Sequence, residues 1–121
     1  MGEKNKREIG SRYEQKAVSF LKQNGYRILE TNYRNRYGEI DIIASKESCL
    51  IFVEVKYRAS HQYGDPLEAV DQWKQGRISR SALYYCSKRP DGMEIPCRFD
   101  VIALDGDHQI RHIENAFEYT E

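Results

Sequence analysis

Three residues in the first half of the chain could together carry out metal-dependent chemistry. Asp41 and Glu54 are carboxylates, and Lys56 follows Glu54 by two positions. Carboxylate oxygens are ligands that Mg²⁺ prefers, and Mg²⁺ commonly uses one or two of them together with water and phosphate oxygens. A lysine beside such a site can neutralise charge or help to activate a water molecule. These residue types therefore point to hydrolysis of a phosphate ester.

A β-hairpin is the clearest local structure that the sequence predicts. Residues 40–45 and 50–57 are apolar runs of strand length with many β-branched side chains, and residues 46–49 separate them. Successive side chains of a strand point to opposite faces, so one face of the hairpin is expected to enter the core. The residues expected on that core face are Ile40, Ile42, Ala44, Ile51, Val53 and Val55.

The other face of the hairpin would carry the charged residues. A four-residue loop places Asp41 opposite Glu54, and Glu39 opposite Lys56. Two opposed carboxylates repel each other, and a divalent cation between them would relieve the repulsion. A slip of one residue would abolish this arrangement. The alternative interpretation is an ordinary solvent-facing surface, with Glu39 and Lys56 forming a cross-strand ion pair.

A further carboxylate, Glu14, lies on a helix predicted for residues 11–24. It borders the apolar stripe formed by Ala17, Val18 and Leu21. From this position alone, a solvent-exposed flank is favoured over a side chain aimed at the sheet.

The remaining elements predict an α/β domain. A second helix is expected to begin at a capping box of Asp65 and Glu68 and to continue to about Lys88, and a break near Asp71 is compatible with the pattern. Strands are expected at residues 26–34, 98–104 and 109–117. The order α-β-β-β-α-β-β predicts layers of helices around a mixed sheet. We expect one domain over residues 1–121, with residues 1–10 as a flexible basic N-terminus.

The distribution of charge is compatible with a polyanionic partner. The formal net charge is zero, but residues 1–90 carry 17 Lys and Arg against 11 Asp and Glu. Residues 91–121 carry 2 against 8. The basic side chains therefore concentrate in the part of the chain that holds Asp41, Glu54 and Lys56, as a nucleic-acid-binding protein requires. From charge alone, a solvated surface with an acidic tail region is an equally good interpretation.

Several other classes of protein find no support in the sequence. No apolar run approaches the ~20 residues of a membrane span, and the N-terminus lacks the apolar segment of a signal peptide. Cys49, Cys86 and Cys97 lack the spacing of a zinc site or a redox pair, which predicts reduced thiols in a cytoplasmic protein. A glycine-rich phosphate loop is absent, and we interpret His108 and His112 as incidental.

The spacing of Glu39-Ile40-Asp41 and Glu54-Val55-Lys56 resembles the PD-(D/E)xK signature of the restriction-endonuclease-like superfamily, although Ile40 stands where the signature has proline. Longer stretches resemble the YraN family, a group of small bacterial proteins described as endonucleases. These stretches are GEIDIIA (38–44), FVEVKYR (52–58), GDPLEAV (64–70) and RFDVI (98–102). The resemblance runs from about Glu8 to Phe117.

This resemblance implies a restriction-endonuclease-like fold of three layers, with a mixed central sheet flanked by helices. It implies that Asp41 and Glu54 bind Mg²⁺ or Mn²⁺ and that Lys56 is the catalytic lysine. Glu14 matches an additional acidic residue of resolvase-like branches, which reverses the preference for a solvent-exposed flank. Lys74 matches a basic position on the second core helix.

The resulting hypothesis is a metal-dependent endonuclease that hydrolyses phosphodiester bonds of nucleic acid, with DNA favoured over RNA and neither excluded. The candidate substrates include branched or structured DNA, the substrate class of Holliday junction resolvase-like nucleases. A homodimer is compatible with such a substrate. Candidate phosphate contacts are Arg34, Arg36, Arg58, Lys74 and Arg77, although an ordinary surface role is as good an interpretation for any single arginine. The rival hypotheses are a non-cleaving nucleic-acid-binding module of the same fold, and an interaction domain without a nucleic-acid role.

Overall fold

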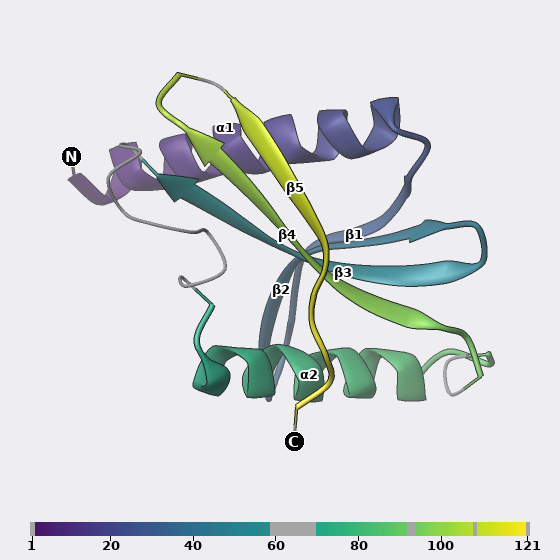
Figure 1. Ribbon diagram of the computed structural model, residues 1–121. Coiled ribbons are helices and arrows are strands. Elements are labelled where there is room, and N and C mark those ends of the chain that lie inside the picture. The colour runs from purple at the N-terminus through teal and green to yellow at the C-terminus, as the bar shows by residue number, and fades with distance from the viewer. Residues whose placement is uncertain (1, 59–69, 92–93, 108, 121) are drawn as a thin grey trace.

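The chain folds as one mixed sheet between two helices (Figure 1). The computed structural model describes the backbone of residues 2–58, 70–91, 94–107 and 109–120, and the side chains in these ranges apart from residues 2–11 and 58. The elements are α1 (Gly2–Gln23), β1 (Arg27–Asn35), β2 (Gly38–Lys46), β3 (Cys49–Arg58), α2 (Gln72–Ser87), β4 (Cys97–Asp105) and β5 (Ile110–Phe117). The predicted α/β class and element order are confirmed.

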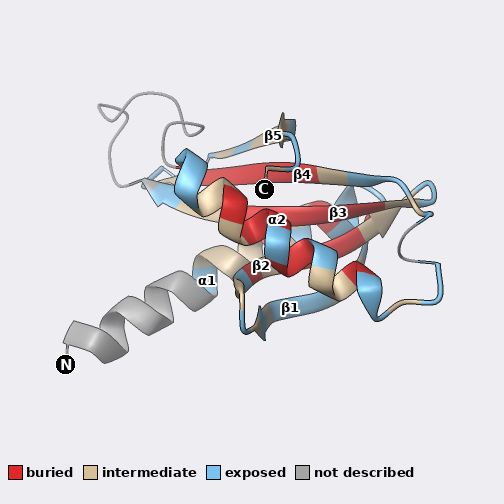
Figure 2. Ribbon diagram, turned by 90° about the horizontal axis from the view of Figure 1, so that it is seen from below, coloured by how far each residue is buried: buried red, intermediate tan, exposed pale blue. Residues whose placement is uncertain are grey.

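Both faces of the sheet are buried, and each is covered by one helix. Ala17 and Leu21 of α1 pack on one face, and Ile78 and Ala82 of α2 pack on the other. The strands follow the order β1-β2-β3-β4-β5, in which β3 and β4 are parallel and the other pairs are antiparallel. Burial is therefore concentrated in the central strands β3 and β4 (Figure 2), as expected for strands connected by a crossover helix.

The first helix is longer than the sequence pattern predicted. α1 begins at Gly2 rather than near residue 11, so residues 2–10 are helical where we expected a flexible tail. Strong helix formers dominate this stretch, and Glu3 with Arg7 and Lys4 with Glu8 have the spacing of stabilising helical pairs. No helix among the described residues combines the length and apolar character needed to cross a membrane.

The second helix begins at a different cap from the one predicted. Asp71 is its N-cap, and the Asp71 side chain accepts a hydrogen bond of 2.8 Å from the N–H of Lys74. The predicted capping box of Asp65 and Glu68 lies outside the described residues. The N-terminus of α2, and Lys74 with it, is therefore fixed by a local contact in its first turn.

The hairpin of β2 and β3 has the predicted register. Pairing extends from Ile42 opposite Val53 to the turn. The turn consists of Glu47 and Ser48, with φ angles of 51° and 65°, which is the tight hairpin turn with two positive φ values. It is shorter than the expected four-residue loop because Lys46 also pairs with Cys49, and this additional pair keeps the same register.

The regular geometry of β2 ends at Asp41. Ile42 packs beneath α1 as predicted, but Ile40 packs beneath α2, so the prediction that both share one core face is wrong. The neighbouring strand is irregular at the same level, since Asn32 of β1 has a φ of 52°. The pairing of β2 with β3 stops at Ile42, and β2 turns away from β3 beyond it. The Asp41 side chain is thereby directed toward β3.

Candidate active site

Asp41 acts as a hydrogen-bond acceptor for the backbone where the two strands separate. Its Oδ2 accepts a hydrogen bond of 2.8 Å from the N–H of Val55 in β3. Burial, and then the negative charge of Glu54, raise the pKa of Asp41 to about 7, and the Val55 N–H opposes this rise only in part. A carboxyl of this kind is partly protonated at neutral pH and would release its proton on binding a cation.

Glu54 is the second carboxylate of the site and is buried, with 7% of its surface exposed, whereas Asp41 is half-buried. Its Oε1 lies 2.6 Å from the Nζ of Lys74 and 3.2 Å from the Nζ of Lys56. Lys56 comes from the same face of β3, whereas Lys74 comes from α2. Glu54 and Lys56, which were expected on one face of the hairpin, are thus in contact, with an additional lysine from a helix that follows later in the chain.

The two lysines differ in how readily they lose a proton. Burial and the neighbouring Lys74 ammonium lower the pKa of Lys56. Burial also acts to lower the pKa of Lys74, but the hydrogen bond and charge of Glu54 outweigh it, so that pKa is raised. Lys56 is therefore the better proton acceptor of the two, and Lys74 is the more persistent cation.

The cross-strand ion pair considered for Glu39 and Lys56 does not form. Glu39 instead contacts Arg34 across the β1–β2 pair at 3.1 Å, and both side chains are largely exposed. Since exposed pairs of this kind contribute little to stability, the charged face of β3 is better explained by the buried contacts of Glu54 than by an ordinary surface hairpin.

Glu14 faces the sheet near these residues. One of its oxygens, Oε1, is buried and has no hydrogen-bond partner among the described residues. Burial, and then the charge of Glu39, raise the pKa of Glu14. The charge of Glu14 in turn contributes to the raised pKa of Asp41. Glu14 is thus half-buried, and not on the solvent-exposed flank of α1 that the helical pattern had favoured.

The oxygen atoms of this site fit a hard divalent cation if water and phosphate supply most of its ligands. Asp41, Glu54 and Glu14 offer carboxylate oxygens, which suit Mg²⁺ and Mn²⁺, and the unsatisfied Glu14 Oε1 leaves an acceptor available. The described part of the chain nevertheless contains no group of three His, Cys, Asp or Glu placed to hold a metal. The fit is therefore to a cation bound through two carboxylates, with water and phosphate oxygens as its other ligands.

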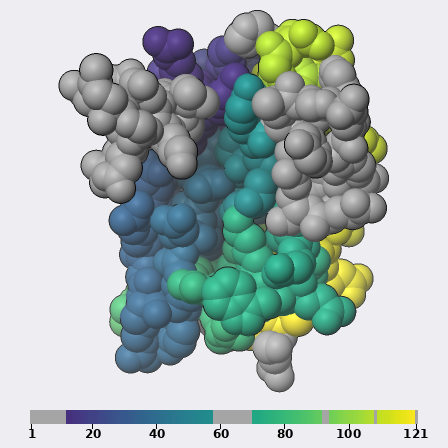
Figure 3. Space-filling view, turned by 90° about the vertical axis from the view of Figure 1, so that its left-hand side faces the viewer, coloured from purple at the N-terminus to yellow at the C-terminus, as the bar shows by residue number. Residues whose placement is uncertain are grey.

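The predicted phosphate contacts divide into three groups. Arg34, Lys74 and Arg77 line one open hollow of about 490 Å³ beside the site. Arg36 lies outside this hollow and donates a hydrogen bond of 2.7 Å to the Tyr37 hydroxyl. The side chain of Arg58 lies outside the described residues. Figure 3 views this side of the molecule, where the teal end of β3 lies between the blue strands β1 and β2 and green α2.

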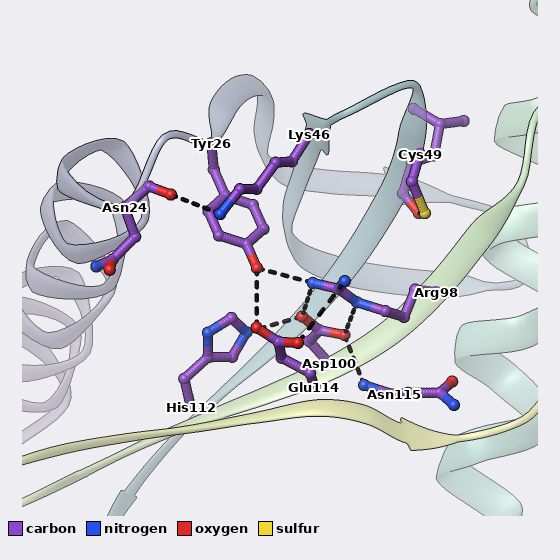
Figure 4. Close-up of polar contacts among 10 residues, drawn as sticks. Asn24, Tyr26, Lys46, Cys49, Arg98, Asp100, His112, Glu114 and Asn115 are labelled. Atoms are coloured by element: carbon purple, nitrogen blue, oxygen red, sulfur yellow. Dashed lines mark hydrogen bonds and ion pairs between the residues drawn. The ribbon is translucent and has the colours of Figure 1, made fainter.

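A second polar cluster was missed by the analysis of the sequence (Figure 4). Asp100 is fully buried and accepts two hydrogen bonds of 2.8 Å from Arg98, and its Oδ2 lies 2.7 Å from His112 Nε2. Arg98 also donates to the Tyr26 hydroxyl at 2.8 Å. Burial acts to raise the pKa of Asp100, but these partners and the Asn115 N–H hold it below its ordinary value.

This second cluster is structural. Both Asp100 oxygens have partners, and the contacts join β4 to β5 and to the start of β1. The interpretation of His112 as incidental is therefore wrong. The Arg98-Phe99-Asp100 sequence gave the available signal, because residues two apart on a strand share a face, but the partners come from distant segments.

The comparison with known sequences places this chain in a family. The profile of "Uncharacterised protein family UPF0102" matches residues 13–104. The chain belongs to the UPF0102 family. The matched span contains the residues assembled at the candidate site, which are Glu14, Asp41, Glu54, Lys56 and Lys74.

Individual UPF0102 proteins match over most of their length. One from Thermodesulfovibrio yellowstonii is 46% identical over 110 residues, which cover 91% of this chain and 96% of the relative. One from Pelobacter propionicus is 50% identical over 118 residues, covering 93% and 84% respectively. One from Lachnoclostridium phytofermentans is 45% identical over 114 residues, covering 94% and 96%. Each of these alignments thus covers more than nine-tenths of this chain.

Proposed function

We propose that this UPF0102 protein is a metal-dependent endonuclease that hydrolyses phosphodiester bonds, with DNA as its substrate. The observation that carries the proposal is the placement of two mutually repelling carboxylates, the half-buried Asp41 and the buried Glu54, beside two lysines where β2 and β3 separate. Burying like charges together disfavours folding. A site for a cation and a phosphodiester gives such an arrangement a use.

Asp41 and Glu54 would hold Mg²⁺ or Mn²⁺ in this proposal, and Glu14 Oε1 would accept a hydrogen bond from a nearby water. The cation would stabilise negative charge on the phosphate and lower the pKa of water. The raised pKa of Asp41 means that cation binding near neutral pH is coupled to loss of a proton from this carboxyl.

The two lysines would have separate roles in hydrolysis. Lys56, with its lowered pKa, would in its neutral form accept a proton from the attacking water. The water oxygen bonds to phosphorus as one P–O ester bond breaks, and the departing oxygen takes a proton from solvent. The products are a phosphate monoester and a hydroxyl. Lys74 would remain cationic and stabilise charge on the phosphate oxygens.

DNA is proposed over RNA because of the resemblance to Holliday junction resolvase-like nucleases, which also suggests branched or structured DNA and a homodimer. The hollow lined by Arg34, Lys74 and Arg77 supports a polyanion at this site, because it places three cationic side chains against one carboxylate, Glu39, beside the candidate site. Among the residues that the structure describes, the site has no set of side chains arranged to read base edges, so we propose binding with little sequence preference.

One observation favours a second function, a nucleic-acid-binding module that does not cleave. Lys56 and Lys74 both contact Glu54, so its charge is balanced without a cation. A binding module would keep these lysines as phosphate contacts. It would derive no benefit from Asp41, because a buried carboxylate beside a polyanion opposes binding.

A cleavage screen tests the proposal. Single-stranded, duplex, flap and four-way DNA would be incubated with the full-length protein in Mg²⁺ or Mn²⁺, beside Asp41→Asn as a matched variant that retains an acceptor for the Val55 N–H. We expect cleavage of at least one substrate by the wild type and its loss in Asp41→Asn and in EDTA. Binding of these substrates without cleavage by the wild type would replace the nuclease with the binding module.

A further inference from the structure

The outer face of α2 carries a stripe of aromatic and cationic side chains. Trp73, Arg77, Arg80 and Tyr84 follow one another at three- and four-residue spacing, so they lie along one side of the helix. Trp73 is 68% exposed, although it is the largest side chain that the helix carries. Tryptophan and tyrosine are enriched at interfaces, because they combine a large apolar ring with a hydrogen-bond donor.

Cations accompany the rings along this stripe. The Arg77 guanidinium carbon lies 4.9 Å from the centre of the Trp73 ring, and the Lys88 ammonium lies 5.1 Å from the centre of the Tyr84 ring. Residues 72–90 contain five Lys and Arg and no Asp or Glu. The stripe is therefore a positively charged surface with rings at intervals.

Two neighbouring hollows follow the stripe. The first adjoins the candidate active site, since it is lined by Trp73, Arg77 and the Lys74 that contacts Glu54. The second, of about 440 Å³, is lined by Tyr37, Arg80, Leu83, Tyr84, Ser87 and Tyr119. One hydrogen bond links their linings, since the Arg77 Nε of the first donates to the carbonyl of Tyr37, which lines the second, at 3.2 Å.

We infer that this stripe binds unpaired nucleotides of the substrate, with Trp73 stacking on a base. Rings interleaved with cations are the arrangement that binds single-stranded nucleic acid, because every base has a face that can stack. The bases of a continuous duplex are stacked on one another and cannot take up Trp73. The inference rests on the proposed function, and it specifies the substrate class as DNA with a single-stranded segment beside the scissile bond.

The charge of the stripe favours DNA over a second copy of the chain as its occupant. In a two-fold symmetric dimer the same surface of each copy meets the other. The stripe carries Arg77 and Arg80, with Lys88 beside Tyr84, and no carboxylate of its own. It would then face its own positive charge, which disfavours association. A polyanion is complementary to it.

The fluorescence of Trp73 tests this inference directly, since Trp73 is the only tryptophan in the chain. The full-length protein would be titrated with an oligothymidylate in EDTA. The fluorescence anisotropy of the same oligonucleotide carrying a dye label reports binding independently. We expect saturable quenching of Trp73 by the single strand, and weaker quenching by a blunt duplex of equal length. Binding that leaves the fluorescence of Trp73 unchanged would overturn the inference.

A pair of variants separates stacking from simple apolar contact. Trp73→Phe keeps an aromatic ring and should bind the single strand within a fewfold of wild type. Trp73→Leu removes the ring and should bind about five- to a hundredfold more weakly, the range of one stacked base. Circular dichroism of both variants checks that α2 remains folded. Equal affinities of wild type and Trp73→Leu would contradict the assignment.

Failure of this inference is distinguishable from failure of the nuclease. Quenching by single-stranded DNA without cleavage would support the inference and remove the nuclease. DNA cleavage by a protein whose Trp73 fluorescence is unchanged on binding, with full affinity in Trp73→Leu, would support the nuclease and overturn the inference about the stripe. Sedimentation adds one further outcome: a wild-type dimer that Trp73→Leu converts to a monomer with unchanged DNA affinity would show that the stripe joins two copies, and the inference would be wrong.

Discussion

Asp41 combines two roles that place opposite demands on its charge. It accepts a hydrogen bond from the Val55 N–H, which favours the ionised carboxylate. It is also buried beside Glu54, which favours the neutral acid and brings its pKa to about 7. The protein therefore holds a carboxyl whose state changes around neutral pH, at the position where the proposed reaction needs a cation ligand.

Asp41→Asn is expected to raise stability at and above neutral pH when no divalent cation is present. The pKa of Asp41 rises from an ordinary value near ~4 to about 7 on folding. The stability that its protonated form contributes is fully present below pH ~4 and is lost as pH rises through about 7. Relative to Asp41→Asn, the wild type should lose at most about 4 kcal/mol of unfolding free energy across this window.

Urea denaturation in EDTA at several pH values measures this difference. Glu47→Gln, which removes a carboxylate from the exposed hairpin turn, is the matched control and should show no such trend. Added Mg²⁺ should stabilise the wild type more than Asp41→Asn. A constant difference between wild type and Asp41→Asn from pH 4 to pH 8 would show that Asp41 is an ordinary surface carboxyl.

The residues of the site were predictable to the extent that they belong to one hairpin. Apolar alternation determines the register of β2 and β3, and that register brings Asp41 toward Glu54. The contact of Lys74 with Glu54 depends on how α2 packs on the sheet, which no local pattern encodes. The contact of His112 with Asp100 likewise joins two strands through their pairing in the sheet, so the sequence spacing gave no indication of it.

At the scale of elements, the bend in β2 creates the site, and the β1–β2 turn fixes that bend against α2. Gly38 begins β2 with a φ of 151°, and a Cβ there would lie 3.2 Å from Ser81 Oγ and 3.3 Å from Arg77 Nε. The close approach allows Arg77 to hold the carbonyl of Tyr37. Sequence patterns identified the turn. They did not predict that Ile40 packs beneath α2, because this depends on the irregular backbone of β2 and of its neighbour β1 at Asn32.

Gly38→Ala is expected to destabilise the protein, because alanine rarely adopts this φ and its Cβ would crowd α2. The expected loss in unfolding free energy is about 1–3 kcal/mol. Gly76→Ala is the matched control, since Gly76 lies within α2. Its Cβ would meet the flexible end of the Arg80 side chain at 3.3 Å and the Thr120 carbonyl oxygen at 3.9 Å, an ordinary contact distance. Improved helix propensity should leave that variant equal to wild type or up to about 1 kcal/mol more stable. Thermal or urea unfolding of both variants compares them, and a harmless Gly38→Ala would mean that the turn does not determine the position of α2.

At the scale of the whole molecule, the zero net charge conceals a separation of charge along the chain. Residues 1–90 carry an excess of six cationic side chains, and residues 91–121 an equal excess of acidic ones. The cationic part supplies both the candidate site and the stripe on α2. The molecule as a whole thus has the electrostatic asymmetry that a DNA-binding protein needs, although its overall balance does not show it.

DNA affinity should therefore depend strongly on salt and weakly on sequence. Each phosphate contact releases counterions, so affinity should fall by about tenfold or more between roughly 50 and 200 mM NaCl. Anisotropy titrations with two unrelated sequences of the same DNA structure would measure both dependences. An affinity unchanged over this range of salt would argue against binding through phosphates.

The central claim is that Lys56 acts on the reacting groups rather than on DNA affinity. It shares Glu54 with Lys74, and the two lysines differ in the direction in which their pKa values shift. In Lys56→Ala, Lys74 still contacts Glu54, so the site keeps one cation there. Loss of the proton acceptor should slow the chemical step by about a hundredfold or more, while DNA binding loses about one phosphate contact.

Single-turnover cleavage, measured beside equilibrium binding on the same DNA for wild type and Lys56→Ala, tests this claim most directly. The account predicts a cleavage rate at least about a hundredfold lower in the variant, with affinity changed only a fewfold. Equal cleavage rates for the two proteins would contradict it and leave Lys56 as a structural partner of Glu54.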